Sequence, residues 1–172
     1  MIHDFLLKIT ISKFKLVIVL LKIKVGINMN DVSNLMLGNE ICFPLYVCSK
    51  GIISKYKPFL EELDLTYTQY IAMSVLWENR KMTVNELGKH LYLDSGTLTP
   101  LLKKLESKGL VTRKRSKEDE RKTIIKITNK GLSLQDKAIS VPSRVNDNVN
   151  LDGESTLDLF NNLTKLLESL NL

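Results

Sequence analysis

The feature that most constrains the fold is an amphipathic helical pattern followed at once by two strand-like runs. From a start near Ser95 or Thr97, four leucines recur at the i, i+3, i+4 and i+7 spacing that buries one face of a helix: Leu98, Leu101, Leu102 and Leu105. The opposite face is small, hydroxylated and basic: Gly96, Pro100, Lys103, Lys104 and Ser107. Such a face suits the DNA major groove, because small side chains let the backbone approach base edges. By itself the periodicity fits an ordinary surface helix equally well.

Two runs rich in β-branched residues follow Gly109. They are Leu110–Arg115 and Lys122–Thr128, separated by a charged loop. Between Thr112 and Lys122 the chain has six Lys or Arg and three Asp or Glu, and the positive excess suits a loop that passes over phosphates. Helix, strand, charged tip and strand predict the wing of a winged helix-turn-helix.

The partner helix of this motif is also present. Thr83 and Glu86 have the spacing of a capping box, and Val84, Leu87 and Leu91 supply a buried face. A further helix is predicted over Tyr67–Glu78, with Ile71, Val75 and Trp77 in the core.

Composition narrows the function classes. The chain has 172 residues, a formal charge of +6 and a pI of about 9.2, which favours a polyanion or a membrane surface as partner. Two cysteines without a CxxC pair, and only His3 and His90, exclude a zinc module and disfavour a disulfide-stapled secreted fold. No phosphate loop, HExxH or nucleophile elbow occurs, so we expect no enzyme, no cofactor and no metal site.

Residues 1–29 are predicted to be an N-terminal extension outside the fold, with Met29 or Met36 as the natural start. Their longest apolar run, Leu16–Leu21, is far too short to cross a bilayer of roughly 30 Å. A basic amphipathic membrane anchor is the alternative interpretation.

Both ends of the remaining chain carry more apolar surface than a small winged domain can cover. We expect an N-terminal dimerisation and sensor helix in residues 30–64, the winged helix-turn-helix in 65–140 and C-terminal dimerisation helices in 141–172. Residues Val141–Asn150 are predicted to be a turn or helix break, and the stripe that follows is Leu157, Phe160, Leu163, Leu166, Leu167 and Leu170. The fold class is therefore mainly α with a small β-hairpin wing.

Several segments together resemble the MarR family, and within it the peroxide-sensing OhrR branch and the related SarZ/MgrA regulators. They are Glu40–Tyr46, Tyr56–Leu60, Leu65–Tyr70, Leu91–Lys103 and Arg115–Arg121. The resemblance runs from about Glu40 to Pro142, with a weaker helical tail. It implies a cytoplasmic homodimeric repressor that binds an inverted-repeat operator in double-stranded DNA and releases it when one cysteine is oxidised.

The resemblance also implies roles for particular residues. Cys42 matches the sensing cysteine, and Tyr56 and Tyr67 match tyrosines that hydrogen-bond its sulfur. Asp119 and Arg121 match a wing pair in which the arginine enters the minor groove and the aspartate braces it. The full set of expected DNA-binding residues is Ser95, Gly96, Thr97, Thr99, Pro100, Lys103, Lys104, Arg115, Asp119 and Arg121.

A buried cysteine is usually inert packing, but two tyrosine hydroxyls would stabilise a Cys42 thiolate and favour attack on a peroxide. Tyr56 lies fourteen residues from Cys42, roughly 21 Å along a continuous helix, so it would have to come from the partner subunit. Cys48 is interpreted as a small core filler. Because no cysteine follows it, the chain resembles the type in which oxidised Cys42 goes on to a mixed disulfide with a low-molecular-weight thiol or to overoxidation. A Cys42–Cys48 bond across the dimer stays open.

Two prolines disturb this interpretation. Pro44 requires that the helix start close to Cys42 or kink there. Pro100 would be harmless in the first turn if Thr97 were the N-cap. Two other functions remain alternatives: a MarR-type repressor released by a noncovalent aromatic ligand, and a thiol peroxidase that uses Cys42.

Overall fold

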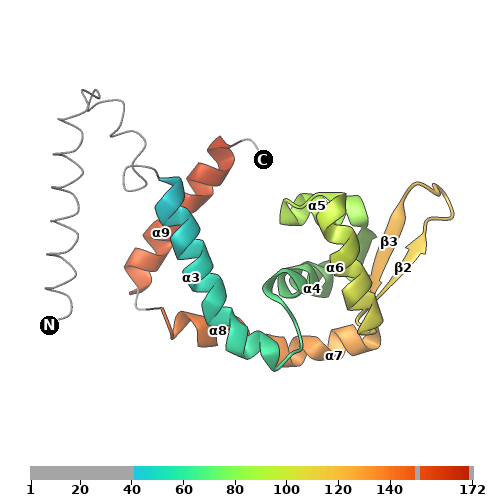
Figure 1. Ribbon diagram of the computed structural model, residues 1–172, viewed down its shortest axis with the longest axis horizontal. Coiled ribbons are helices and arrows are strands. Elements are labelled where there is room, and N and C mark those ends of the chain that lie inside the picture. The colour runs from blue at the N-terminus through green and yellow to red at the C-terminus, as the bar shows by residue number, and fades with distance from the viewer. Residues whose placement is uncertain (1–40, 150–151, 171–172) are drawn as a thin grey trace, which may run out of the picture. The chain divides into compact units, whose positions relative to one another are not determined.

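The computed structural model describes residues 41–149 and 152–170 (Figure 1). The chain divides into two compact units between Lys50 and Gly51. The predictions for the extension of residues 1–29, and for the sensor segment before Ile41, lie outside the described residues. Within the described part of the chain, no helix is both long and apolar enough to cross a membrane.

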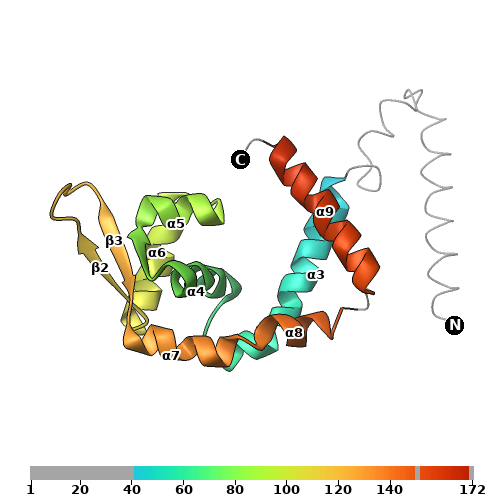
Figure 2. The same ribbon diagram turned by 180° about the vertical axis from the view of Figure 1, so that it is seen from behind.

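Seven helices and three strands make up the described residues. In chain order they are α3 (Cys42–Glu61), α4 (Tyr67–Asn79), β1 (Lys81–Thr83), α5 (Val84–Leu91), α6 (Ser95–Ser107), β2 (Val111–Arg115), β3 (Thr123–Ile127), α7 (Asn129–Ala138), α8 (Val141–Asn146) and α9 (Gly153–Ser169). This confirms the predicted fold class, and Figure 2 shows the hairpin of β2 and β3 extending beyond α6.

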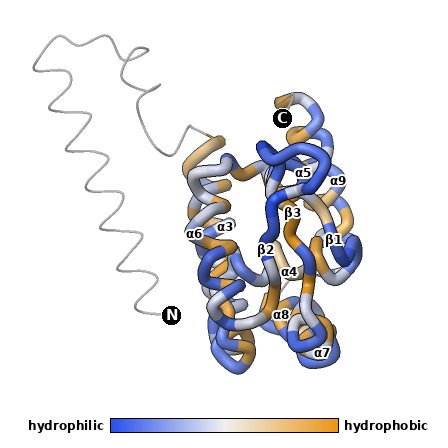
Figure 3. The backbone as a smooth tube through the Cα atoms, turned by 90° about the vertical axis from the view of Figure 1, so that its right-hand side faces the viewer, coloured by the Kyte–Doolittle hydropathy of each residue, from blue (hydrophilic) through white to orange (hydrophobic). Residues whose placement is uncertain are grey.

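The sheet has three antiparallel strands in the order β1-β3-β2. Strand β1 was not predicted, because three residues are too few to show an alternating pattern. Its pairing with β3 places Met82 opposite Ile125, and both are buried. In Figure 3 strand β3 is hydrophobic, whereas the loop that joins it to β2 is hydrophilic.

The core forms where α4, α5 and α6 pack against one another and against the sheet. Trp77 is 6 % exposed, and its indole N–H donates to the carbonyl of Gly131 on α7 at 2.7 Å. Leu98, Leu101, Leu102 and Leu105 are all buried, as the leucine pattern predicted. Ile71 and Val75 are half-buried at the edge of this core.

Side-chain caps begin helices α4, α5 and α6. The predicted capping box at Thr83 and Glu86 is present, and Thr66 and Gln69 form a second one at the start of α4. Of the two starts predicted for α6, near Ser95 or Thr97, the helix uses Ser95, so Thr97 is not its N-cap. Asp94 is the N-cap, and its Oδ1 accepts the Thr97 N–H at 2.8 Å.

This cap moves Pro100 from the first turn into the second turn of α6. A proline there has no N–H for the carbonyl four residues earlier, which belongs to Gly96. Both Gly96 and Pro100 are exposed, so water can satisfy that carbonyl.

Helix α3 begins at Cys42, which puts Pro44 in its first turn, where a missing N–H costs little. The helix then continues through Pro58 to Glu61. Residues Val141–Asn150 were expected to be a turn or break. Instead they contain helix α8, and Pro142 lies in its first turn, where the fixed φ of proline is compatible with a helix.

Candidate nucleic-acid interface and cysteine site

The buried leucines orient α6 so that its other face is open. All seven residues predicted to contact DNA from this helix are exposed: Ser95, Gly96, Thr97, Thr99, Pro100, Lys103 and Lys104. Arg115, at the end of β2, is exposed as well. Apart from Asp94, which caps the helix, and Glu106, which pairs with Arg113, α6 and its N-cap carry no carboxylate.

The wing tip holds its arginine in a defined conformation. Asp119 Oδ1 accepts the backbone N–H of Arg121 at 3.1 Å and its Nε–H at 3.2 Å, and Asp119 Oδ2 lies 3.7 Å from Lys122 Nζ. These partners, first of all the backbone N–H of Arg121, keep the pKa of Asp119 below its usual value. The Arg121 side chain is 93 % exposed, so its guanidinium can reach a partner outside the protein.

A polar cleft of about 270 Å³ separates the wing from the helix-turn-helix. Its lining residues are Thr83, Val84, Asn85, Ser95, Thr99, Leu102, Arg113, Arg121, Lys122 and Thr123. Hydroxyl, amide and basic groups therefore converge between the N-terminal ends of α5 and α6 and the wing. Such groups make the phosphate and sugar contacts that position a protein on a duplex.

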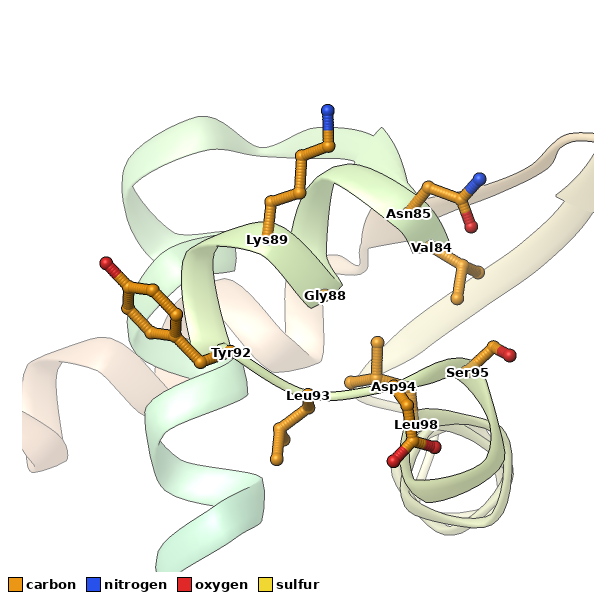
Figure 4. A pocket seen from close by; sticks show the side chains of 9 residues that line it. All are labelled: Val84, Asn85, Gly88, Lys89, Tyr92, Leu93, Asp94, Ser95 and Leu98. Carbon is orange, nitrogen blue, oxygen red and sulfur yellow. The ribbon is translucent and has the colours of Figure 1, made fainter. Parts of the chain in front are cut away.

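A second cavity, of about 540 Å³, opens between α5 and the start of α6 (Figure 4). Asn85, Lys89 and Tyr92 project outward around it. At its base α5 lies close to the turn: a Cβ on Gly88 would be 2.7 Å from the carbonyl oxygen of Leu93 and 3.2 Å from a methyl group of Leu98. Gly88 therefore permits the tight approach of the two helices, which the sequence reading did not identify.

Sequence reasoning also missed the connection between α6 and the wing. Glu106 on α6 binds Arg113 on β2 through the backbone N–H, at 3.0 Å, and the guanidinium, with an Nη2 to Oε2 distance of 2.7 Å. The two residues belong to different elements seven positions apart, so no helical or strand periodicity could have paired them.

Both cysteines are free and exposed. Cys42 lies in the first turn of α3 and Cys48 lies further along the same helix. The interpretation of Cys48 as a core filler was wrong, because its thiol is on the surface of the protomer. Cys42 is exposed too, so it is not an inert residue packed inside the protomer.

The two predicted tyrosines are in contact with each other. The rings of Tyr56, on α3, and Tyr67, the first residue of α4, pack edge to face with centroids 5.0 Å apart. The ring centroid of Tyr70 lies 5.9 Å from that of Tyr56. Burial, followed by the neighbouring Tyr67 and Tyr70, raises the pKa of Tyr56, so its hydroxyl remains a hydrogen-bond donor at neutral pH.

Comparison with known proteins gives consistent results. The family described as "Transcriptional regulator SarA/Rot" matches residues 54–138. The organic hydroperoxide resistance transcriptional regulator of Bacillus subtilis is 44 % identical over 142 residues, which is 83 % of this chain and 97 % of that protein. The regulator SarZ of Staphylococcus aureus is 42 % identical over 132 residues, covering 77 % of this chain and 89 % of SarZ.

Among solved structures, reduced AbfR bound to DNA matches with a TM-score of 0.66 and 34 % identity, covering 83 % of this chain and 99 % of that one. AbfR is a Staphylococcus epidermidis protein. The chain belongs to the SarA/Rot family of MarR-like winged-helix transcriptional regulators.

Proposed function

We propose that this protein is a homodimeric, cytoplasmic repressor that binds an inverted-repeat operator in DNA and releases it when Cys42 is oxidised by a peroxide. The observation that carries the DNA-binding part is the exposed, carboxylate-poor face of α6 beside a wing whose Arg121 is held by Asp119. In this arrangement α6 enters the major groove and the wing arginine reaches the adjacent minor groove.

Dimerisation is supported by the apolar surface of the C-terminal helix. Helix α9 has no buried residue in the protomer, and the large apolar side chains exposed on it and at its end are Leu157, Leu159, Phe160, Leu163, Leu167 and Leu170. A helix with so much exposed apolar surface needs a partner, and a second copy would bury the same surface on both subunits. Two recognition helices related by a two-fold axis then match an inverted repeat.

The redox part rests on Cys42 and Tyr56. The thiol is exposed and therefore accessible to a peroxide. Because α3 is continuous from Cys42 through Tyr56, the rise between them is roughly 21 Å, so the Tyr56 that donates to the sulfur comes from the partner subunit. Oxidation at this position would change contacts between the two subunits.

The chemistry is a two-electron oxidation of sulfur. The Cys42 thiolate attacks the distal oxygen of the hydroperoxide, the O–O bond breaks, and the alkoxide takes a proton and leaves as an alcohol. The resulting sulfenic acid condenses with a small thiol to give a mixed disulfide and water. A reducing thiol then displaces the bound thiol and restores Cys42.

The test is a gel shift on the operator that footprinting locates upstream of the gene itself. We expect cumene hydroperoxide to release the wild type and excess thiol to restore binding. Cys42→Ser should bind the operator and ignore the peroxide, whereas the matched variant Cys48→Ser should respond as the wild type does. Peroxide-induced release of Cys42→Ser would refute the sensor assignment.

A ligand-released repressor is the second candidate. A pocket of about 340 Å³ is lined mainly by the end of α3 and the start of α4, including Ile53, Leu60, Leu65 and Tyr67. Its volume and apolar walls suit a small aromatic molecule. Under this alternative, Cys42→Ser would leave release unchanged, and the release would require the ligand and no oxidant.

A further inference from the structure

The side chain of Lys108 lies where the ends of three helices meet. Lys108 is the C-cap residue of α6. Its ammonium group reaches Asp64, in the turn that follows α3, and Gln69, in the first turn of α4, and both belong to a different part of the fold from the DNA-binding face. This junction is not part of the DNA-binding surface described above. Its hydrogen bonds restrict the orientation of α6 relative to α3 and α4.

Helices α3 and α6 both end in the same hydrogen-bonded motif. At the end of α3, the Leu65 N–H donates to Leu60 O at 2.9 Å and Asp64, at φ +52°, closes the turn. At the end of α6, the Leu110 N–H donates to Leu105 O at 3.0 Å and Gly109, at φ +71°, closes the turn. Each is a Schellman motif, which leaves carbonyl groups available to outside donors.

Lys108 supplies such a donor to the end of α3. Its Nζ donates to the carbonyl oxygen of Asp64, lies 3.1 Å from Asp64 Oδ1 and donates to Gln69 Oε1 at 3.3 Å. The Asp64 side chain is 85 % exposed, so its carboxylate contributes little through charge. The carbonyl oxygen and the Gln69 amide are the partners that fix direction.

Gln69 ties the junction to the start of α4. It is 3 % exposed, and its Oε1 accepts the Thr66 N–H at 3.2 Å as part of the capping box of α4. The same oxygen accepts from Lys108. One ammonium therefore joins the end of the recognition helix, the end of α3 and the start of α4.

The end of α3 is also bound on its other side, by helix α8. Glu62 accepts two hydrogen bonds from the guanidinium of Arg144 on α8, at 3.0 and 3.1 Å, and the same guanidinium lies 4.2 Å from the ring centroid of Phe59. Lys108 itself is fixed from α7, because Lys130 Nζ donates to its carbonyl oxygen at 2.8 Å. The corner between α3 and α4 is thus bound to α8 on one side and to α6 on the other.

We propose that Lys108 is a positioning residue for operator recognition: it sets the angle of α6 relative to the α3–α4 corner and delivers any displacement of α3 to the recognition helix. Apolar packing is non-directional and tolerates small rotations. Hydrogen bonds to three oxygens on two other elements are directional and restrict them. The inference rests on the proposed function, because it assumes that two recognition helices must match two half-sites.

The test uses full-length protein and the operator found by footprinting, together with a copy that has one base pair inserted between its half-sites. We expect the wild type to bind the altered copy about tenfold more weakly, because the insertion shifts the half-sites relative to successive major grooves. Lys108→Met, which keeps the aliphatic stem, should reduce this discrimination by about threefold, which corresponds to the low end of the net contribution of one hydrogen bond. Lys137→Met, an exposed lysine on α7, removes the same charge and should discriminate as the wild type does.

A second readout needs no DNA. A spin label at Lys103→Cys, in a Cys42→Ser and Cys48→Ser background, reports the distance between the recognition helices of the two subunits. Lys108→Met and Lys108→Gln should broaden this distance distribution, and Lys137→Met should not. Unchanged discrimination and an unchanged distribution in the Lys108 variants would overturn the proposal. Failure of the wild type to bind any duplex would overturn the proposed function instead, and the distance distribution would still decide the role of Lys108.

Discussion

The carboxylate of Glu106 binds Arg113 through three donors. Oε1 accepts the backbone N–H at 3.0 Å, and Oε2 accepts Nε–H at 2.8 Å and lies 2.7 Å from Nη2. Glu106 is on α6 and Arg113 is on β2, so this pair fixes the base of the wing to the recognition helix. Planar pairing of this kind adds geometric restraint as well as free energy.

Glu106→Gln should therefore reduce the free energy of unfolding at neutral pH by roughly 1 kcal/mol, because the pair is partly exposed and its charge is screened. The Arg113 side chain, first of all, keeps the pKa of Glu106 below its usual value. A lowered folded-state pKa means that the stabilisation is complete above the unfolded value of about 4.3 and is lost as the pH falls through the folded value. Urea unfolding at fixed protein concentration, at pH 7 and at pH 3, measures both effects.

The control for this pair is Glu118→Gln in the wing loop, where the side chain is exposed. Its stability should stay within about 0.5 kcal/mol of the wild type at both pH values. A difference between Glu106→Gln and wild type that is equally large at pH 7 and pH 3 would contradict the assignment of the stabilisation to the ionised pair.

Arg121→Ala should weaken operator binding and make it less dependent on salt. The guanidinium is held by Asp119 yet 93 % exposed, so the variant should remove the proposed DNA contact and leave the fold intact. Titrations at several salt concentrations should give a slope of log affinity against log salt that is smaller by about 1. Lys137→Ala on α7 should leave the slope unchanged, and an unchanged slope in Arg121→Ala would remove the wing from the interface.

Gly88→Ala should destabilise the helix-turn-helix. The added methyl group would lie 2.7 Å from the Leu93 carbonyl oxygen, which is backbone and cannot move without shifting the turn. We expect a loss of about 1 to 3 kcal/mol, as for overpacking elsewhere, even though alanine is the better helix former. Gly153→Ala, where nothing lies within 4 Å of the added atom, is the matched control. Equal unfolding midpoints for the two variants would show that α5 and the turn are not tightly packed.

Phe160→Glu should shift the protein from dimer to monomer. Phe160 is 66 % exposed on α9 in the protomer, so a charge there costs little before association and would be buried after it. Sedimentation velocity over a range of concentrations measures the shift, with Asn161→Glu on the same helix as the charge control. A dimer of undiminished affinity in Phe160→Glu would place the subunit contact elsewhere.

Local patterns were enough to predict most of the DNA-binding domain. The leucine spacing predicted which face of α6 is buried, and the capping box at Thr83 predicted where α5 begins. These signals work because the helical period and the capping hydrogen bonds act within a few residues. The stretch from Leu110 to Thr128 was predicted to be a hairpin for the same reason, because two runs rich in β-branched residues flank a charged loop.

Where two local solutions competed, the sequence could not choose between them. Asp94 and Thr97 are both good N-caps, and the choice depends on where the preceding turn brings the chain. The exposure of Cys48 likewise depends on which side of α3 the rest of the protomer covers. The turn expected at Val141 became α8 because Val141 and Val145 reach the core, a tertiary gain that local signals do not contain.

The helix-turn-helix, the wing, the buried face of α6 and the family could be predicted from the sequence, because these features depend on neighbours along the chain. The short strand β1, the helix α8, the pairing of Glu106 with Arg113 and the link from Lys108 to the α3–α4 corner emerged only in the folded protein. The partners of Lys108 lie 44 and 39 positions away. Contacts at such separations carry no periodic signal, and they exist only because the packed core brings three helix ends to one place.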